Sequence, residues 1–134
     1  MGRASLDRLI HRHRIADRRR GLERTVRVWL PPMPPRAVLY MHDGQHVLAE
    51  GRSRRPRWRA HETALDLIER GWILPLAIVG IDHGGPKRRW RDYLPYPDPR
   101  NPRASAFEAD RYADFVVRTV LPQVARLHPE LARA

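Results

Sequence analysis

The chain has 134 residues, enough for one domain at most, and carries a net charge of +11 from 26 basic and 15 acidic residues. The absence of cysteine excludes disulfides and thiolate metal sites. The longest apolar run, residues 72–81, is interrupted by Pro75 and is far shorter than the ~20 residues that span a bilayer. The basic N-terminus lacks the apolar stretch of a signal peptide, so we expect a cytoplasmic protein with no membrane partner.

The positive charge does not by itself indicate a nucleic-acid-binding site. Lys87 is the only lysine, and a bias this uniform toward arginine is typical of a compositional habit of the source. The arginines are spread over the N-terminus, residues 52–59 and residues 88–91 rather than along one helix face. We therefore expect no specific nucleic-acid partner. A non-catalytic basic module that binds nucleic acid or another polyanion stays open as an alternative function.

The chain is predicted to form a single partial domain over residues 1–134, in which residues 1–10 are a loose basic extension. Residues 11–17 and 25–30 are predicted to be an antiparallel pair of strands. His11 and His13 would share one face of the first strand. An exposed edge strand is favoured over a metal site there, because no third ligand is close in sequence.

Residues 37–41 are a short apolar run that enters a polar turn with Gly44 at its centre. Such a run predicts a strand covered on both faces, as in the parallel sheet of an α/β domain. Apolar residues recur along residues 58–72 at the spacing of one helix face, and residues 76–81 form a second buried strand. We therefore predict a βαβ unit in which Gly80 marks the close approach of another backbone or helix.

The last third of the sequence is predicted to contain one loop and one helix. Residues 86–102 hold five prolines, which predicts irregular structure. A helix is predicted from Ser105 onward, with a kink or break at Pro122, because the proline ring clashes with the carbonyl one turn earlier. The pair His128–Pro129 is predicted to end this helix.

Three segments, in this order, resemble the putative-esterase family of α/β-hydrolases, which includes siderophore esterases. They are Thr25-Val26-Arg27-Val28-Trp29-Leu30-Pro31-Pro32, Tyr40-Met41-His42-Asp43-Gly44-Gln45 and Ile78-Val79-Gly80-Ile81-Asp82. The resemblance implies an α/β fold with a partial α/β-hydrolase sheet: an N-terminal antiparallel strand pair, then parallel βαβ strands with flanking helices. It also implies hydrolysis of a small-molecule carboxylic ester through an acyl-serine, without a cofactor.

The resemblance also implies roles for individual residues. The backbone N–H of Gly44 or Gln45 would form part of the oxyanion hole, which stabilises the tetrahedral intermediate of acyl transfer. Arg91-Asp92-Tyr93-Leu94-Pro95 resembles a family loop beside the active-site cleft, although a surface crossover remains the alternative for this segment. The candidate substrate-cleft residues, which follow the two parallel strands or lie in this loop, are His42, Asp43, Asp82, His83, Arg91 and Tyr93.

The sequence lacks the G-x-S-x-G elbow that carries the nucleophile of such enzymes. Of the serines Ser5, Ser53 and Ser105, only Ser53 has a glycine two residues before it, and Arg55 stands two residues after. We therefore predict the N-terminal half of an esterase, without the nucleophile and the Asp and His of the triad, and inactive alone. Residues 37–41 would then form an apolar sheet edge, through which we expect self-association.

A metal-dependent hydrolase is a further alternative. His42, Asp43, His46, Asp82 and His83 offer nitrogen and oxygen ligands at the ends of two neighbouring strands. However, His42 and Asp43 are neighbours on opposite sides of an extended chain, and each of the five has a place in the esterase pattern. We therefore expect no bound metal.

Overall fold

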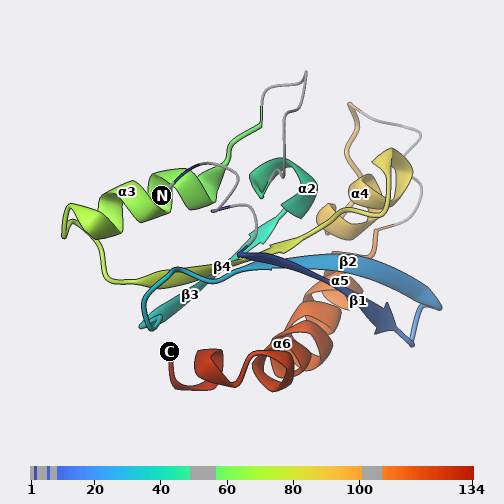
Figure 1. Cartoon of the computed structure of the whole chain (residues 1–134). Coiled ribbons are helices and arrows are strands. Elements are labelled where there is room, and N and C mark those ends of the chain that lie inside the picture. The colour runs from blue at the N-terminus through green and yellow to red at the C-terminus, as the bar shows by residue number, and fades with distance from the viewer. Residues whose placement is uncertain (1, 3–5, 7–8, 49–56, 101–106) are drawn as a thin grey trace.

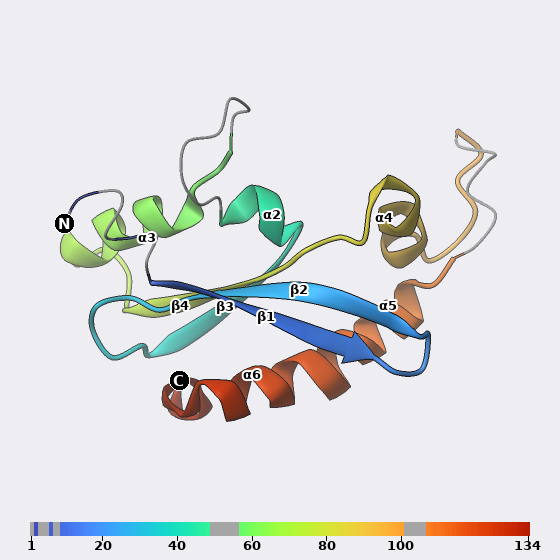
Figure 2. The ribbon, with the colours of Figure 1, turned by 45° about the vertical axis from the view of Figure 1, so that its right-hand side comes forward.

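The computed structural model describes residues 2, 6, 9–48, 57–100 and 107–134. Within these residues, one four-stranded sheet of order β1-β2-β4-β3 lies between two layers of helices (Figure 1). Helices α2, Gly44–Val47, and α3, Ala60–Glu69, cover one face. Helices α5, Ala109–Phe115, and α6, Leu121–Leu127, cover the other, as Figure 2 shows from a second side. The predicted α/β class is confirmed.

Strands β1, Ile10–Asp17, and β2, Leu22–Trp29, form the predicted antiparallel pair and are paired along their whole length. Gly21 lies in the turn between them at φ 63°, a left-handed conformation that glycine adopts without steric cost. Side chains of β2 point alternately toward two cores, because Val26 packs on the α6 side and Trp29 on the α3 side. Both faces of β2 are therefore covered.

Strand β4, Leu76–Ile81, lies in the sheet interior, antiparallel to β2 and parallel to β3, Ala37–His42. Helix α3 lies between β3 and β4 in sequence, which confirms the predicted βαβ unit. Strand β4 is buried from Ala77 onward, whereas β3 is exposed or half-buried at every residue. As predicted, residues 37–41 form a sheet edge, because no described strand pairs with their outer side. Each face of this strand packs against a core, through Tyr40 on one side and Met41 on the other, although the cover is only partial.

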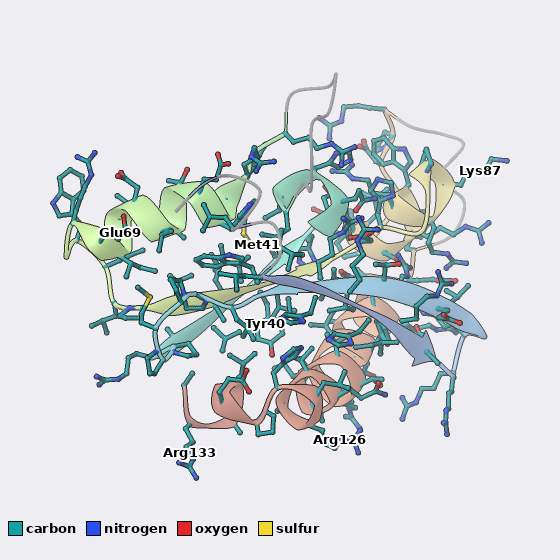
Figure 3. The ribbon with its side chains drawn as sticks, viewed as in Figure 1. Tyr40, Met41, Glu69, Lys87, Arg126 and Arg133 are labelled. Atoms are coloured by element: carbon teal, nitrogen blue, oxygen red, sulfur yellow. The ribbon has the colours of Figure 1, made fainter. Side chains whose placement is uncertain are left out.

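Two hydrophobic cores lie on opposite faces of the sheet. The first consists of Ile15, Val26, Val28, Ala77, Val79, Ile81, Tyr112, Phe115, Val120, Val124 and Leu131. The second consists of Leu6, Ile10, Trp29, Val47, Leu48, Ala64, Leu65, Ile68 and Ile78. Figure 3 shows Tyr40 on the α6 side of β3 and Met41 on the α3 side, so successive residues of this strand reach different cores.

Helix α4, Pro86–Tyr93, corrects the prediction that residues 86–102 are irregular. Pro86 stands in the first turn of the helix, where the missing N–H costs nothing and the fixed φ favours the helical conformation. The other prolines of the segment, from Pro95 onward, follow the end of the helix. These prolines therefore bracket a helix rather than interrupt it.

The C-terminal helix remains helical through Pro122, where a kink or break was predicted. The irregularity is a π-helical turn, η1, Val116–Val120, between α5 and α6 and directly before the turn that holds the proline. A wider turn is one way in which a helix accommodates a residue that cannot make the usual bond one turn back. Helix α6 ends at Leu127, as predicted from His128–Pro129, and a 3₁₀ helix, η2, Pro129–Arg133, follows.

Ser5, Ser53, Ser105 and most of the predicted N-terminal extension lie outside the described residues. Of that extension, Gly2, Leu6, Leu9 and Ile10 are described, and Leu6 and Ile10 are buried in the second core. Among the residues that the structure describes, no helix is both long enough and apolar enough to cross a membrane.

Candidate active site

The predicted cleft residues gather at the carboxyl ends of β3 and β4. His42 ends β3 opposite Ile81 at the end of β4, because the two strands are parallel. The chain turns into α2 after β3, and Asp82 and His83 continue β4. Helices α4 and α5 lie at the same end of the sheet (Figures 1 and 2), and they supply the side chains of Tyr93 and Tyr112. Segments from three separate parts of the sequence, 42–45, 82–93 and 109–115, therefore meet here, as expected for an α/β sheet.

The turn after β3 is packed directly on the backbone of β4. A Cβ atom added to Gly44 would lie 2.5 Å from the carbonyl carbon of Gly80 and 2.8 Å from Asp82 Oδ1. A Cβ atom added to Gly80 would in turn lie 2.8 Å from the Cα atom of Gly44. The close backbone approach predicted at Gly80 is therefore confirmed, and the two glycines fix the position of the turn.

Asp43 adopts a left-handed conformation, with φ 54° and ψ 45°, at the N-terminus of α2. Its carboxylate accepts hydrogen bonds from Arg89 Nη2 at 2.9 Å and from Tyr93 Oη at 3.0 Å. Burial opposes ionisation of this carboxyl group, but the hydrogen bonds from Arg89 and Tyr93 outweigh burial and lower the pKa of Asp43. Asp43 is therefore an ionised group that ties α2 to α4.

Two tyrosines surround His42. Its Nδ1 atom lies 2.9 Å from Tyr112 Oη, and its ring centroid lies 5.2 Å from that of Tyr93. Burial raises the pKa of Tyr112, and burial together with the neighbouring Asp43 charge raises the pKa of Tyr93 to about 12. Both phenols are therefore neutral near pH 7 and can donate a hydrogen bond.

Gln45 joins the turn after β3 to the loop after β4. The backbone N–H of His83 donates to Gln45 Oε1 at 3.1 Å, and Gln45 Nε2 donates to the His83 carbonyl at 3.5 Å. The N–H of Gly85 donates to His83 Nδ1 at 3.0 Å, which places the proton of the neutral ring on Nε2. Burial lowers the pKa of His83, so the neutral ring is favoured near pH 7.

The backbone N–H groups of Gly44 and Gln45 open helix α2. The first N–H groups of a helix have no acceptor one turn earlier, and the Asp43 side chain does not cap them. Gly44 is buried, whereas Gln45 is half-buried. Of the two predicted oxyanion-hole donors, the N–H of Gln45 therefore belongs to the more exposed residue.

Asp82 and Arg91 are engaged with partners outside this cluster, although the Asp82 carboxylate lies directly against the turn at Gly44. Asp82 accepts two hydrogen bonds from Arg27, from Nε at 2.8 Å and Nη2 at 2.9 Å, so it is held in a bidentate ion pair. Arg91 is exposed and lines a separate hollow with Gly84 and Arg88. The structure thus brings together His42, Asp43, Gln45, His83 and Tyr93, and leaves Asp82 and Arg91 engaged elsewhere.

Two hollows share His42 as a lining residue. The hollow on the α2 side, of about 570 Å³, is lined by Leu39, Tyr40, Met41, His42, Asp43, His46, Val47 and Trp58. The hollow on the α5 side, of about 540 Å³, is lined by His42, Asp92, Tyr93, Ala109, Tyr112, Ala113, Val116 and Val117. Mainly apolar linings with a few polar groups are typical of small-molecule sites.

A buried ionic network holds α4 in place. Asp92, which is 1% exposed, accepts hydrogen bonds from Arg20 Nη1 at 2.7 Å and from Arg24. Glu108 accepts hydrogen bonds from Arg20 Nη1 at 3.0 Å and from Arg88. Because an unpaired buried charge is costly, this network fixes the end of α4 and hence the position of the residue after Asp92, Tyr93.

Sequence reasoning missed Arg89, Tyr112 and Asp92. Arg89 and Tyr93 are four residues apart and lie on one face of α4, a relation that becomes visible only once this segment is assigned to a helix. Tyr112 lies on the apolar stripe of the C-terminal helix, where a tyrosine is indistinguishable from a core residue. No local signal marks Asp92 as the partner of arginines in the β1–β2 hairpin.

The family model described as Putative esterase matches residues 18–133. The chain belongs to the Putative esterase family. The matched segment includes β2, both parallel strands and the helices α2 to α6, so the family resemblance found in the three motifs extends over the described fold from β2 onward. No curated protein sequence matches the chain.

Three solved structures illustrate the similarity of the fold. The BES protein from Bacillus cereus has a TM-score of 0.70 at 18% identity, with 88% of this chain and 46% of that chain covered. The siderophore hydrolase EstA from Aspergillus nidulans has a TM-score of 0.62 at 17% identity, with 92% of this chain and 46% of that chain covered. Ferric enterobactin esterase from Salmonella typhimurium has a TM-score of 0.60 at 17% identity, with 88% of this chain and 26% of that chain covered. The chain therefore spans less than half the length of each of these structures, and the likeness concerns the fold.

The described residues do not form a metal centre. No group of three or more His, Asp or Glu side chains among them is arranged to hold a metal ion. The rings of His46 and His83 lie 5.7 Å apart, but Asp82 is bound to Arg27 and Asp43 to Arg89. The geometry thus gives no support to the metal-dependent alternative.

Proposed function

We propose that this chain supplies the N-terminal part of a serine esterase that hydrolyses small-molecule carboxylic esters. A second part of the enzyme, outside these 134 residues, contributes the nucleophilic serine with its Asp and His. The observation that carries the proposal is the turn at Gly44 and Gln45, whose N–H groups open α2 at the carboxyl end of a parallel strand. Membership of the Putative esterase family supports the reaction class.

In the proposed reaction, the serine Oγ attacks the ester carbonyl carbon and passes its proton to the histidine, which later gives it to the leaving alcohol; the carbonyl oxygen becomes an oxyanion. The N–H of Gln45 donates to this oxyanion, while the contact between Gly44 and Gly80 keeps the donor in place. The C–O bond to the alcohol then breaks, the alcohol leaves with a proton, and water hydrolyses the acyl-serine. The two hollows at His42 accept the acyl and alcohol portions of the ester.

Strand β3 is the surface on which the second part of the enzyme pairs. Its outer side is unpaired within the described chain, and its sequence has the apolar character of an interior strand. In the absence of that part, two copies of this chain associate through the same edge. The chain alone has no esterase activity because the nucleophilic serine belongs to the second part of the enzyme, and it tends to self-associate because the edge at β3 is open.

The experiment compares ester hydrolysis by the 134-residue chain alone and by the chain completed with the polypeptide encoded directly downstream. The completed protein is expected to turn over a short p-nitrophenyl ester, and the isolated chain is not. Replacing Gln45 by proline removes the backbone N–H in the first helical turn, where proline is tolerated, and is expected to lower kcat by about 10²-fold.

The matched control is Gln45→Ala, which removes the side-chain contacts with His83 but retains the N–H. This variant is expected to lose far less activity than Gln45→Pro. Equal losses in the two variants would show that Gln45 acts through its side chain and not through an oxyanion contact. Serine-dependent hydrolysis by the isolated chain would contradict the proposed division of the enzyme.

A further inference from the structure

A separate hollow in the molecule gathers six arginines. It has a volume of about 800 Å³ and lies between the turn that joins β1 to β2 and the helices α5 and α6. Its arginines are Arg18, Arg19, Arg20, Arg111, Arg118 and Arg126. We call this hollow the arginine cleft. Among the described residues, it shares no lining residue with the two hollows at His42.

The fold brings these arginines together from two distant parts of the sequence. Arg111 and Arg118 are seven residues apart and Arg126 follows eight later, so each step is about two helical turns. The three therefore form a row along the helix that runs from α5 to α6, and Figure 3 shows Arg126 extending from α6. The other three are consecutive in the β1–β2 turn, at the end of β1 that lies beside this helix in Figure 2.

The carboxylates of the cleft do not balance its arginines. Asp17 accepts a hydrogen bond from Arg20 Nε at 2.6 Å, and Asp114 lies 3.5 Å from Arg118 and 3.7 Å from Arg19. Three further arginines of the cleft have no carboxylate within 4.0 Å among the described residues: Arg18, Arg111 and Arg126. Six guanidinium groups against two carboxylates give the lining a net charge of +4.

Arg20 provides a second, independent observation. Its side chain is only 5% exposed, and it lines the cleft. Hydrogen bonds to Asp17, Asp92 and Glu108 use Nε and Nη1, but Nη2 is buried without a hydrogen-bond partner in the described structure. A buried donor without an acceptor is rare and costly, and an anionic oxygen in the cleft is the kind of acceptor that this guanidinium lacks.

The geometry points to a binding site: we propose that the arginine cleft binds a compact ligand that carries two or more phosphate groups. Guanidinium groups bind phosphate oxygens in a bidentate fashion, and arginines on two walls of the cleft provide donors for more than one anionic group. The volume falls within the range of small-molecule sites. Phe115, the aromatic residue of the lining, is buried, so no base could stack on it as in a single-strand site.

The test is a calorimetric titration of the full chain with inorganic triphosphate at about 0.15 M sodium chloride in a phosphate-free buffer. We expect saturable binding, with weaker binding of orthophosphate. Changing Arg111 and Arg126 together to glutamine should weaken triphosphate binding at least tenfold. The matched control changes Arg36 and Arg133 to glutamine, which removes the same charge from exposed positions outside the cleft and should alter the affinity less than twofold.

Both double variants change exposed side chains, so each should keep the melting temperature of the unchanged protein, which shows that it is folded. If the variant with Arg111→Gln and Arg126→Gln does not fold, Arg18→Gln takes its place. Equal weakening in the two double variants would overturn the proposal, because it would show attraction to net charge and not to the cleft. No detectable binding of triphosphate at this salt concentration would also overturn it. Duplex DNA that binds at the same salt, weakens with the cleft variant and is not displaced by triphosphate would assign the cleft to nucleic acid instead.

Discussion

The two edges of the sheet differ in the way they meet solvent. Strand β1 places charged and polar residues such as His11, Arg12 and Arg14 on the exposed outside of the molecule. Strand β3 has no charged residue before His42, and Leu39 is 44% exposed. Natural proteins protect sheet edges with charge, because an open apolar edge pairs with other chains. The edge at β1 is thus suited to solvent, whereas the edge at β3 is suited to a neighbouring strand.

The same difference continues at the carboxyl end of β3. The outer side of β3 is unpaired within the described chain, but the turn that follows this strand is held by Gly80, by Arg89 and Tyr93 on α4, and by Gln45 across to His83. An open strand that leads into a rigid turn is what the proposed esterase requires, because the strand edge pairs with the second part of the enzyme and an oxyanion donor has to be in place before charge develops on the substrate.

The largest expected effect comes from the contact that joins this turn to the centre of the sheet. Gly44→Ala places a methyl group 2.5 Å from the backbone of Gly80, where neither side can move freely. We expect the free energy of unfolding to fall by about 3 kcal/mol, measured by urea denaturation. Gly2→Ala, at a position with open space around it, is the control and should leave stability unchanged. A tolerated Gly44→Ala would mean that the turn is not held against β4.

Self-association tests the comparison of the two edges directly. Leu39→Lys gives β3 the charged character of β1, and we expect it to weaken self-association at least tenfold in sedimentation equilibrium, about 1.4 kcal/mol. The matched control is Leu74→Lys, because Leu74 is 63% exposed but lies outside the strand. If both variants dissociate equally, association depends on general apolar exposure and not on the β3 edge.

The ion pair between Asp43 and Arg89 gives a smaller, pH-dependent effect. Arg89→Gln removes charge-assisted hydrogen bonds from a side chain that is 44% exposed, so we expect a loss of about 1 kcal/mol at pH 7. The pKa of Asp43 is lowered in the folded protein, so this stabilisation is present above the unfolded-state pKa and is lost as the pH falls through the folded-state pKa. The free energies of unfolding of the unchanged protein and of Arg89→Gln, measured by urea denaturation, should therefore converge in strongly acidic solution. Arg100→Gln, which breaks the ion pair between Asp98 and an arginine side chain that is 90% exposed, is the control and should change stability much less at either pH.

Much of the fold could be predicted from the sequence, because the signals are local. The apolar runs of β3 and β4 and the helical spacing between them are each contained in a short window, and three motifs in order identify the family. The prediction for residues 86–102 was wrong because counting prolines ignores their position relative to a helix start. The π-helical turn before Pro122 likewise depends on how the helix adapts to its packing.

The site could be predicted less completely, because its geometry depends on distant pairs. Gly44 and Gln45 follow from the motif, but the reason for Gly44 is the backbone of Gly80 on the next strand. Arg89 contacts Asp43 only because α4 folds back over the sheet. The arginine cleft is invisible in sequence for the same reason, since the β1–β2 turn and the C-terminal helix meet only in the folded chain.

The smallest expected effect concerns Tyr93 and distinguishes the contributions to the rigid turn. Tyr93→Phe removes one donor to the Asp43 carboxylate and leaves Arg89 in place. We therefore expect the pKa of Asp43, followed by NMR of the labelled carboxyl carbon, to rise toward its ordinary value, and to rise further in Arg89→Gln. Tyr96→Phe, at a side chain that is 70% exposed, is the control and should leave the titration of Asp43 unchanged. If Tyr93→Phe also leaves it unchanged, the phenol does not donate to Asp43, and Arg89 alone holds the turn after β3 to α4.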